Sequence, residues 1–207
     1  GLGEGAKGPA TRPMDIAVII PTFNRATLLP AALDSVIAQT CGGRIEAESV
    51  ALNDVVLAKR SETRMIHVML RQGNEVVSSF SADGLIVSTP TGSTAYNLSA
   101  GGPIVHPAMK LLIATAICPH SLSARPVVLP PDPPVTFQFV PRHDSDIGEA
   151  MVWIDGQEKW SIAPGDQVTL TATDSPLRLV ASPETRYFER LRQKLLWNGD
   201  VKTSSRT

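Results

Sequence analysis

Short stretches with the pattern of β-strands recur along the chain after about residue 47, and turn signals separate them. Near the end, Asp155 and Gly156 lie between two such stretches and predict a hairpin, because glycine tolerates a positive φ. A proline-dense stretch at 126–141 is expected at sheet edges and connections, since proline donates no ladder hydrogen bond. Strands without intervening helices favour an antiparallel sandwich or barrel-like sheet. The strand candidates are residues 50–58, 65–70, 76–81, 85–89, 151–154, 159–162 and 168–172.

The two ends of the chain have a different pattern. An unbroken apolar run at 16–20, followed by a helical pattern at 28–37, predicts a β-loop-helix fragment of an α/β sheet. Near the other end, an amphipathic helix is expected at 185–197. The expected fold class is therefore α+β and mainly β, with an antiparallel β-sandwich-like domain. The expected divisions are a disordered arm at 1–14, the α/β fragment at 15–44, the β domain at 45–198 and a tail at 199–207.

Charge and cysteine usage exclude some classes of partner. A net charge of −1 gives no clustered excess of Lys and Arg for nucleic acid or an anionic membrane. The apolar stretches are far shorter than the roughly 20 residues that span a bilayer. Cys41 and Cys118 have no CxxC spacing, which is typical of free thiols in a reducing cytosol, so a cytoplasmic location is expected. Cys118 precedes His120 by two positions, and a small apolar residue at a strand end is favoured over a metal ligand.

The segment at 83–102 carries the most chemical information. A strand candidate there runs into a Pro-Thr-Gly turn, and a short helix is predicted to begin near Ser93 or Thr94. Hydroxyls at Thr91, Ser93 and Thr94 are expected to cap this helix, while its free backbone N–H groups suit sugar hydroxyls or phosphate oxygens. The segment is not a P-loop, because no lysine follows the glycine. A capped strand-to-helix turn without a ligand is the structural alternative.

Several ordered motifs agree with one family at once. They are 51–57 (ALNDVVL), 83–102 (DGLIVSTPTGSTAYNLSAGG), 117–126 (ICPHSLSARP), 155–157 (DGQ) and 187–197 (YFERLRQKLLW). Over about residues 47–198 the chain resembles the C-terminal, NAD-binding domain of the NAD kinases. The resemblance implies ATP-dependent phosphorylation of the 2′-hydroxyl of NAD to give NADP, with Mg²⁺ accompanying ATP. It also implies a homodimer or homotetramer whose sites are built from two protomers.

The same resemblance implies a set of binding residues. Asn53 and Asp54 match the pair that reads the adenine end of NAD, and an amide and a carboxylate suit that role. Arg64 matches a position near a phosphate or ribose, and Asp83 matches the carboxylate on the nicotinamide side. Each also has a plainer explanation. Asn53 and Asp54 could form a polar turn, Arg64 could be a surface charge, and Asp83 could belong to an Asp-Gly turn. The remaining matches are the helix-start run Thr94, Ala95, Tyr96, Asn97, Leu98 and Ser99, with Tyr96 able to stack on a base, and the hairpin residue Gln157.

The chain departs from the family in its first part. An NAD kinase carries a Gly-Gly-Asp-Gly-Thr loop whose aspartate activates the attacking hydroxyl, and the 207 residues contain no such loop. Residues 15–40 instead resemble the first strand and helix of a family-2 glycosyltransferase, so the chain is interpreted as chimeric. Three hypotheses follow: an NAD kinase by descent, an inactive NAD(P)-binding or oligomerisation module, and, least favoured, a glycosyltransferase fragment. The catalytic residues stay unknown at this stage.

Overall fold

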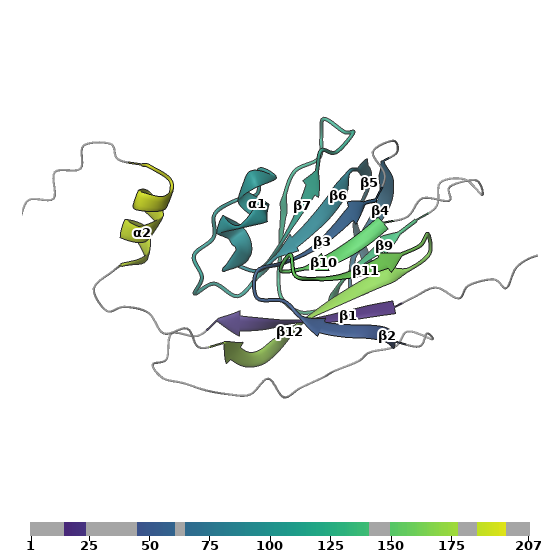
Figure 1. Ribbon diagram of the computed structural model, residues 1–207, viewed down its shortest axis with the longest axis horizontal. Helices are drawn as coiled ribbons and strands as arrows, with labels where there is room; N and C mark the ends of the chain where they lie inside the picture. The colour runs from purple at the N-terminus through teal and green to yellow at the C-terminus, as the bar shows by residue number, and fades with distance from the viewer. Residues whose placement is uncertain (1–14, 24–44, 61–64, 141–149, 178–185, 198–207) are drawn as a thin grey trace, which may run out of the picture. The chain divides into compact units, whose positions relative to one another are not determined.

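The computed structural model describes residues 15–23, 45–60, 65–140, 150–177 and 186–197. The described residues fall into two units, one of residues 15–23, 45–60, 65–140 and 150–177 and the other of residues 186–197 (Figure 1). In the described part of the second unit the chain forms helix α2 (Tyr187–Lys194), which confirms the expected C-terminal helix. Along this helix Leu191 is buried, and the rings of Tyr187 and Phe188 meet edge to face. No helix in the described residues is long and apolar enough to cross a membrane.

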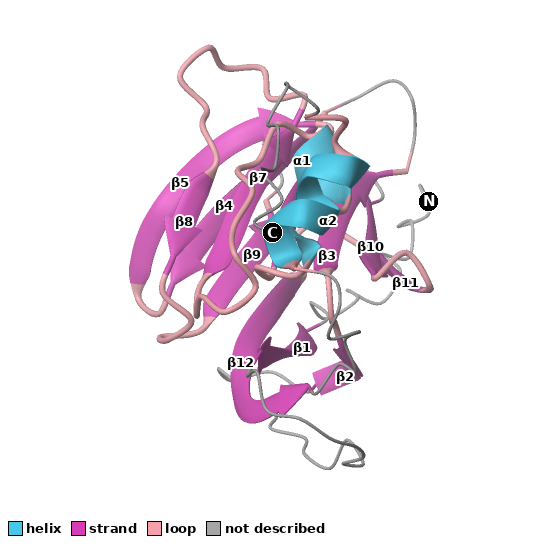
Figure 2. Cartoon of the chain, turned by 90° about the vertical axis from the view of Figure 1, so that its left-hand side faces the viewer, coloured by secondary structure: helices cyan, strands magenta, loops and turns pink. Residues whose placement is uncertain are grey.

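The described residues of the first unit form two six-stranded sheets (Figure 2). The first sheet has the order β2-β1-β12-β9-β4-β5. Its strands are β1 (Asp15–Phe23), β2 (Ile45–Val50), β4 (Ile66–Gln72), β5 (Glu75–Ala82), β9 (Val135–Phe139) and β12 (Gln167–Leu177). The second sheet has the order β11-β10-β3-β6-β7-β8. Its strands are β3 (Asp54–Lys59), β6 (Gly84–Ser88), β7 (Leu112–Ile117), β8 (Val127–Leu129), β10 (Ala150–Ile154) and β11 (Glu158–Ile162).

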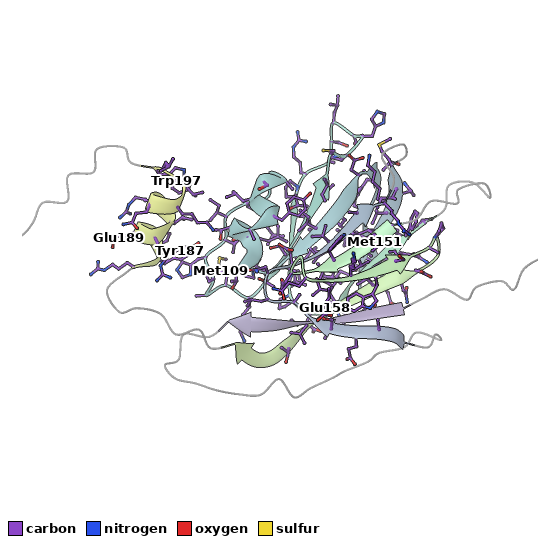
Figure 3. The ribbon with its side chains drawn as sticks, in the orientation of Figure 1. Met109, Met151, Glu158, Tyr187, Glu189 and Trp197 are labelled. Atoms are coloured by element: carbon purple, nitrogen blue, oxygen red, sulfur yellow. The ribbon has the colours of Figure 1, made fainter. Side chains whose placement is uncertain are left out.

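The hydrophobic core lies between the two sheets. Along β4 the side chains alternate, and Ile66, Val68 and Leu70 are buried. They join one continuous cluster with residues of both sheets, such as Leu57 of β3 and Phe137 of β9. Each such side chain contributes about 1.5–3 kcal/mol when it leaves water. At one edge Glu158 of β11, labelled in Figure 3, accepts a hydrogen bond from the Ser49 hydroxyl of β2 at 2.8 Å. The two sheets therefore also meet through polar groups. The expected mainly β, sandwich-like fold is confirmed.

Two expectations about individual strands are wrong. The strand expected at 50–58 is split, because the chain ends β2 at Val50 in one sheet and begins β3 at Asp54 in the other. The proline-dense stretch lies only partly at an edge. β8 is an edge strand, as expected, but β9 lies inside its sheet between β12 and β4. β9 can do so because the prolines flank it and none falls within it.

The strand predicted at 16–20 is present as part of β1, which lies between β2 and β12 and runs parallel to both. The helix predicted after it, at 28–37, lies outside the described residues, as do the arm at 1–14 and the tail at 199–207. The division at 44/45 stays a prediction, and the strands on its two sides, β1 and β2, are neighbours in one sheet.

Candidate functional site

A pocket of about 500 Å³ lies on the outer face of the second sheet, where β3 begins and β10 ends. Val55 and Leu57 of β3 point into the core, so by the alternation of a strand Asp54, Val56 and Ala58 face outward into the pocket. Helix α1 (Tyr96–Ser99) begins beside it. The lining residues are Asn53, Asp54, Val56, Ala58, Ala95, Tyr96, Trp153, Asp155 and Gly156. The pocket thus brings together four of the predicted residues: Asn53, Asp54, Ala95 and Tyr96.

The Asp155 carboxylate fixes the turn that carries Asn53 and Asp54. It accepts hydrogen bonds from the backbone N–H groups of Leu52 (2.7 Å), Asn53 (2.7 Å) and Asp54 (3.0 Å). The Asp155 N–H donates in turn to the Asp54 carbonyl at 3.0 Å. Asp155 reaches this position with φ +49°, a left-handed conformation that Asp adopts more readily than most residues. From the sequence, Asp155 is expected only as a hairpin residue. Nothing in the residues around it predicts that it also accepts hydrogen bonds from three distant N–H groups.

The chain after β6 packs directly on the same turn. The Thr89 hydroxyl donates to the Leu52 carbonyl (2.7 Å) and accepts from the Gly92 N–H (3.0 Å), while the Thr89 N–H donates to the Asn53 carbonyl (2.9 Å). A Cβ atom on Gly92 would lie 2.0 Å from the Asn53 carbonyl oxygen. Only glycine therefore lets the short 3₁₀ helix η1 (Gly92–Thr94) approach this closely and bring Ala95 and Tyr96 to the pocket.

The predicted helix-start run separates into different roles. The Asn97 side chain is fully buried and makes no contact with the pocket. Its amide donates to the carbonyls of Ser93 (3.2 Å) and Pro103 (3.1 Å), and its oxygen accepts from the Thr115 hydroxyl (2.7 Å). Asn97 therefore holds α1 on the sheet and has no side-chain atom left for a ligand. Three further members of the run, Thr94, Leu98 and Ser99, do not line the pocket.

The expected helix caps are wrong. Neither η1 nor α1 has a side-chain hydrogen bond at its N-cap residue, which is Thr91 for η1 and Ala95 for α1. The Ser93 hydroxyl instead donates to the Pro90 carbonyl (2.7 Å) and accepts from the Val105 N–H (3.0 Å). The Ser93 hydroxyl therefore stabilises the loop around η1 and does not cap a helix.

The environment of Asp54 makes its carboxyl titrate near neutral pH. Burial first, and then the nearby Asp155 carboxylate, raise the pKa of Asp54 from 3.8 to about 6. A hydrogen bond from the Tyr96 backbone acts the other way, since it favours the charged form. Above about pH 6 the pocket thus contains an ionised acceptor, and below that pH a neutral carboxyl group.

The other predicted residues lie apart from the pocket. Asp83 pairs with Lys59 at 2.7 Å, at the far end of β3 from Asn53 and Asp54. Lys59 is five positions along β3 from Asp54, or roughly 16 Å away. Gln157 is exposed in the β10–β11 turn, and its backbone N–H donates to the Ile154 carbonyl. Arg64 lies outside the described residues.

A second cavity, of about 430 Å³, opens between β5 and β8 and contains none of the predicted binding residues. Within it the His67 ring is hydrogen-bonded to the hydroxyls of Ser79 (3.0 Å) and Ser81 (3.2 Å). The second cavity is lined by residues of the 117–126 motif, such as His120 and Arg125, whereas the Asn53–Asp54 pocket is the one that contains predicted binding residues.

Comparison with known proteins identifies the family. The family described as ATP-NAD kinase C-terminal domain matches residues 52–182, well over half of the chain. The chain belongs to the NAD kinase family. The NAD kinase of Desulforamulus reducens is 41% identical over 154 residues, which are 74% of this chain and 52% of that protein. The NAD kinase of Heliobacterium modesticaldum is 47% identical over 145 residues, which are 70% of this chain and 50% of that protein.

Solved structures agree with this assignment. Yeast NADH kinase complexed with NADH matches with a TM-score of 0.63 and 28% identity, over 74% of this chain and 46% of that one. The Archaeoglobus fulgidus NAD kinase in complex with ATP matches with a TM-score of 0.59 and 30% identity, over 72% of this chain and 55% of that one. The chain spans about half the length of the curated NAD kinases it matches. None of these matches supports the resemblance of residues 15–40 to a glycosyltransferase.

Proposed function

We propose that this chain binds NAD or NADP in the pocket at the start of β3, as the NAD-binding domain of an NAD kinase. The observation that carries the proposal is the Asn53–Asp54 turn, which the Asp155 carboxylate holds at the pocket through three hydrogen bonds. A site whose polar groups are fixed before the ligand arrives loses less entropy on binding.

The chemistry of the lining suits a nucleotide base. The Asn53 amide can both donate to and accept from a base edge, and the ionised Asp54 carboxylate can accept from an exocyclic amine. The Tyr96 side chain is 46% exposed at the rim, so its ring is available for stacking. The yeast NADH kinase structure, which contains NADH, supports a dinucleotide as the ligand class.

We propose further that ATP is the phosphate donor of the family reaction, since the Archaeoglobus NAD kinase was solved with ATP. Among the described residues no group of three His, Cys, Asp or Glu side chains could hold a metal ion. The described residues therefore do not fit a resident metal. Mg²⁺ belongs to this proposal only as part of the ATP substrate.

The chain alone is proposed to bind NAD but to make little or no NADP. The Gly-Gly-Asp-Gly-Thr loop is absent from the 207 residues, and a positioned general base contributes about 10²–10⁴-fold to a rate. Asp54 and Asp83 are the candidate substitutes. By the family resemblance Asp54 serves the adenine end and Asp83 the nicotinamide end, so neither is proposed to stand at the reacting hydroxyl.

Asp83 fits the proposal if the assembly is a homodimer or homotetramer with sites built from two protomers. Its partner Lys59 lies roughly 16 Å from Asp54 along β3, and by the family resemblance Asp83 would serve the nicotinamide side of a ligand held by a second copy. Light scattering coupled to size-exclusion chromatography measures the assembly, and a strict monomer would contradict this part of the proposal. We also propose a cytoplasmic location for the protein.

A thermal-shift comparison tests the proposed ligand. NAD or NADP should raise the melting temperature, because binding at 100 times Kd adds about 2.7 kcal/mol to the stability. UDP-glucose should leave it unchanged. The Asn53→Ala variant serves as the matched control and should lose the shift while keeping the melting temperature of the free protein. A shift with UDP-glucose and none with NAD or NADP would overturn the proposal.

A further inference from the structure

One tryptophan of the hairpin β10–β11 lines the pocket and is not part of the hydrophobic core. Val152 and Ile154 of β10 belong to the hydrophobic core, so Trp153 between them faces outward and lines the pocket. The hairpin's other tryptophan, Trp160, pairs with Val152 and packs against the core. The two rings therefore lie on opposite faces of one hairpin.

A lysine holds the outward ring. Lys159 is the cross-strand partner of Trp153, and its ammonium group lies over the indole at 5.2 Å from the ring centroid. A cation over an aromatic face is attracted by the ring's quadrupole, most strongly for tryptophan. Lys159 thus lies over one face of the indole, and the ring as a whole lines the pocket that a ligand would enter.

We propose that Trp153 is a stacking surface for a base of the bound dinucleotide and that Lys159 is a positioning residue that holds the indole ring. The inference rests on the proposed function and adds a determinant of ligand choice to the same pocket. The polar groups of Asn53 and Asp54 lie in the pocket that Trp153 lines, so a planar base can bond through its edge while its face covers the indole. Val56, the neighbour of Trp153 on β3, and Ala58 form an apolar floor.

The stacking energy sets the loss of NAD affinity that is expected when the ring is removed. A base stacked on an aromatic side chain loses about 1–3 kcal/mol when the ring is replaced by alanine. The NAD affinity of Trp153→Ala should thus fall about tenfold, and that of Trp153→Phe, which keeps a smaller ring, should fall less. Lys159→Gln should weaken NAD about two- to fivefold, whereas Lys159→Arg keeps a cation over the ring and should restore the parent affinity.

The experiment uses the whole chain and calorimetric titration with NAD, AMP and NMN. Loss of affinity for AMP in Trp153→Ala assigns the stacked base as adenine, and loss for NMN assigns it as nicotinamide. NAD should quench the tryptophan emission of the parent and of Trp160→Phe, and this quenching should disappear in Trp153→Phe. The melting temperatures of all variants are recorded without ligand, so that a folding defect is recognised. If Trp153→Ala does not fold, the stacking role is tested with Trp153→Phe and the two Lys159 variants.

Two results overturn the inference while the proposed function stands. The first is a parent that binds NAD and folded Trp153 variants that bind it within twofold as tightly, with the quenching intact. The second is weaker NAD binding in Trp153→Ala with unchanged binding of both AMP and NMN, because the ring would then act on something other than a base. A parent that binds neither NAD nor NADP refutes the proposed function itself.

Discussion

Replacing Asp155 with alanine is expected to lower the free energy of unfolding by roughly 3–4 kcal/mol. The carboxylate accepts three backbone hydrogen bonds of 2.7, 2.7 and 3.0 Å, and each bond to a charged group contributes about 1.5–3 kcal/mol. Partial exposure of the three N–H groups lets water replace part of this. Alanine at φ +49° adds about 1 kcal/mol of backbone strain, and relief of the repulsion with Asp54 offsets some of the loss.

Urea unfolding followed by circular dichroism measures this change, provided that the slope with denaturant stays constant. Asp155→Asn is the matched control, because asparagine tolerates a positive φ and keeps one of the two oxygens. It should cost only about 1–2 kcal/mol, since the acceptor shared by Asn53 and Asp54 remains. NAD binding should weaken in both variants. An alanine variant within 1 kcal/mol of the parent, with NAD affinity unchanged, would refute the role given to Asp155.

The remaining predictions concern the other parts of the site and the first strand. NAD affinity should fall as the pH drops through about 6, because protonated Asp54 no longer accepts as an anion, and titrations of Asp54→Asn should lose this dependence. Because the pKa of Asp54 is raised in the folded state, this group stabilises the fold below pH 3.8, its unfolded pKa, and the stabilisation is lost as the pH rises through about 6. In urea unfolding at pH 8, Asp54→Asn should therefore have a higher free energy of unfolding than the parent. Gly92→Ala should cost about 1–3 kcal/mol in the same assay and weaken NAD, because its Cβ meets the Asn53 backbone, and parent-like behaviour would contradict that. Deleting residues 1–40 removes β1 from between β2 and β12, so the truncated chain should aggregate on size-exclusion chromatography; a soluble, native-like product would show that β1 is dispensable.

Strands with one buried face could be predicted because their side chains alternate. β4 and β10 follow this rule, with every second residue buried. β7 does not, since Leu112, Ile113, Ala114 and Thr115 are all buried, and it was not among the expected strands. Its outer face is covered by α1, whose Asn97 accepts from Thr115, and no periodicity survives when both faces are covered.

The pocket was predictable only in part. The motif around Asn53 and Asp54 marked a turn that lines the pocket, but the break between β2 and β3 was hidden in a continuous strand pattern. The break depends on Asp155, which lies about one hundred positions later. Its carboxylate accepts hydrogen bonds from the N–H groups of residues 52–54, so these groups do not bond to a neighbouring strand. Trp153 was missed for a similar reason, since an aromatic residue in a hairpin strand usually packs on the core, as Trp160 does.

The most direct test measures binding and turnover on one preparation of the purified chain. NAD affinity is obtained by calorimetry, and NADP formation from NAD and Mg²⁺-ATP is followed with a coupled enzyme specific for NADP. Saturable NAD binding with little or no NADP formed is the expected result, because the chain has the proposed dinucleotide pocket and its 207 residues contain no Gly-Gly-Asp-Gly-Thr loop. Absence of saturable binding would contradict the dinucleotide site. Turnover that disappears in Asp54→Asn or Asp83→Ala would contradict the claim that catalysis needs the missing loop.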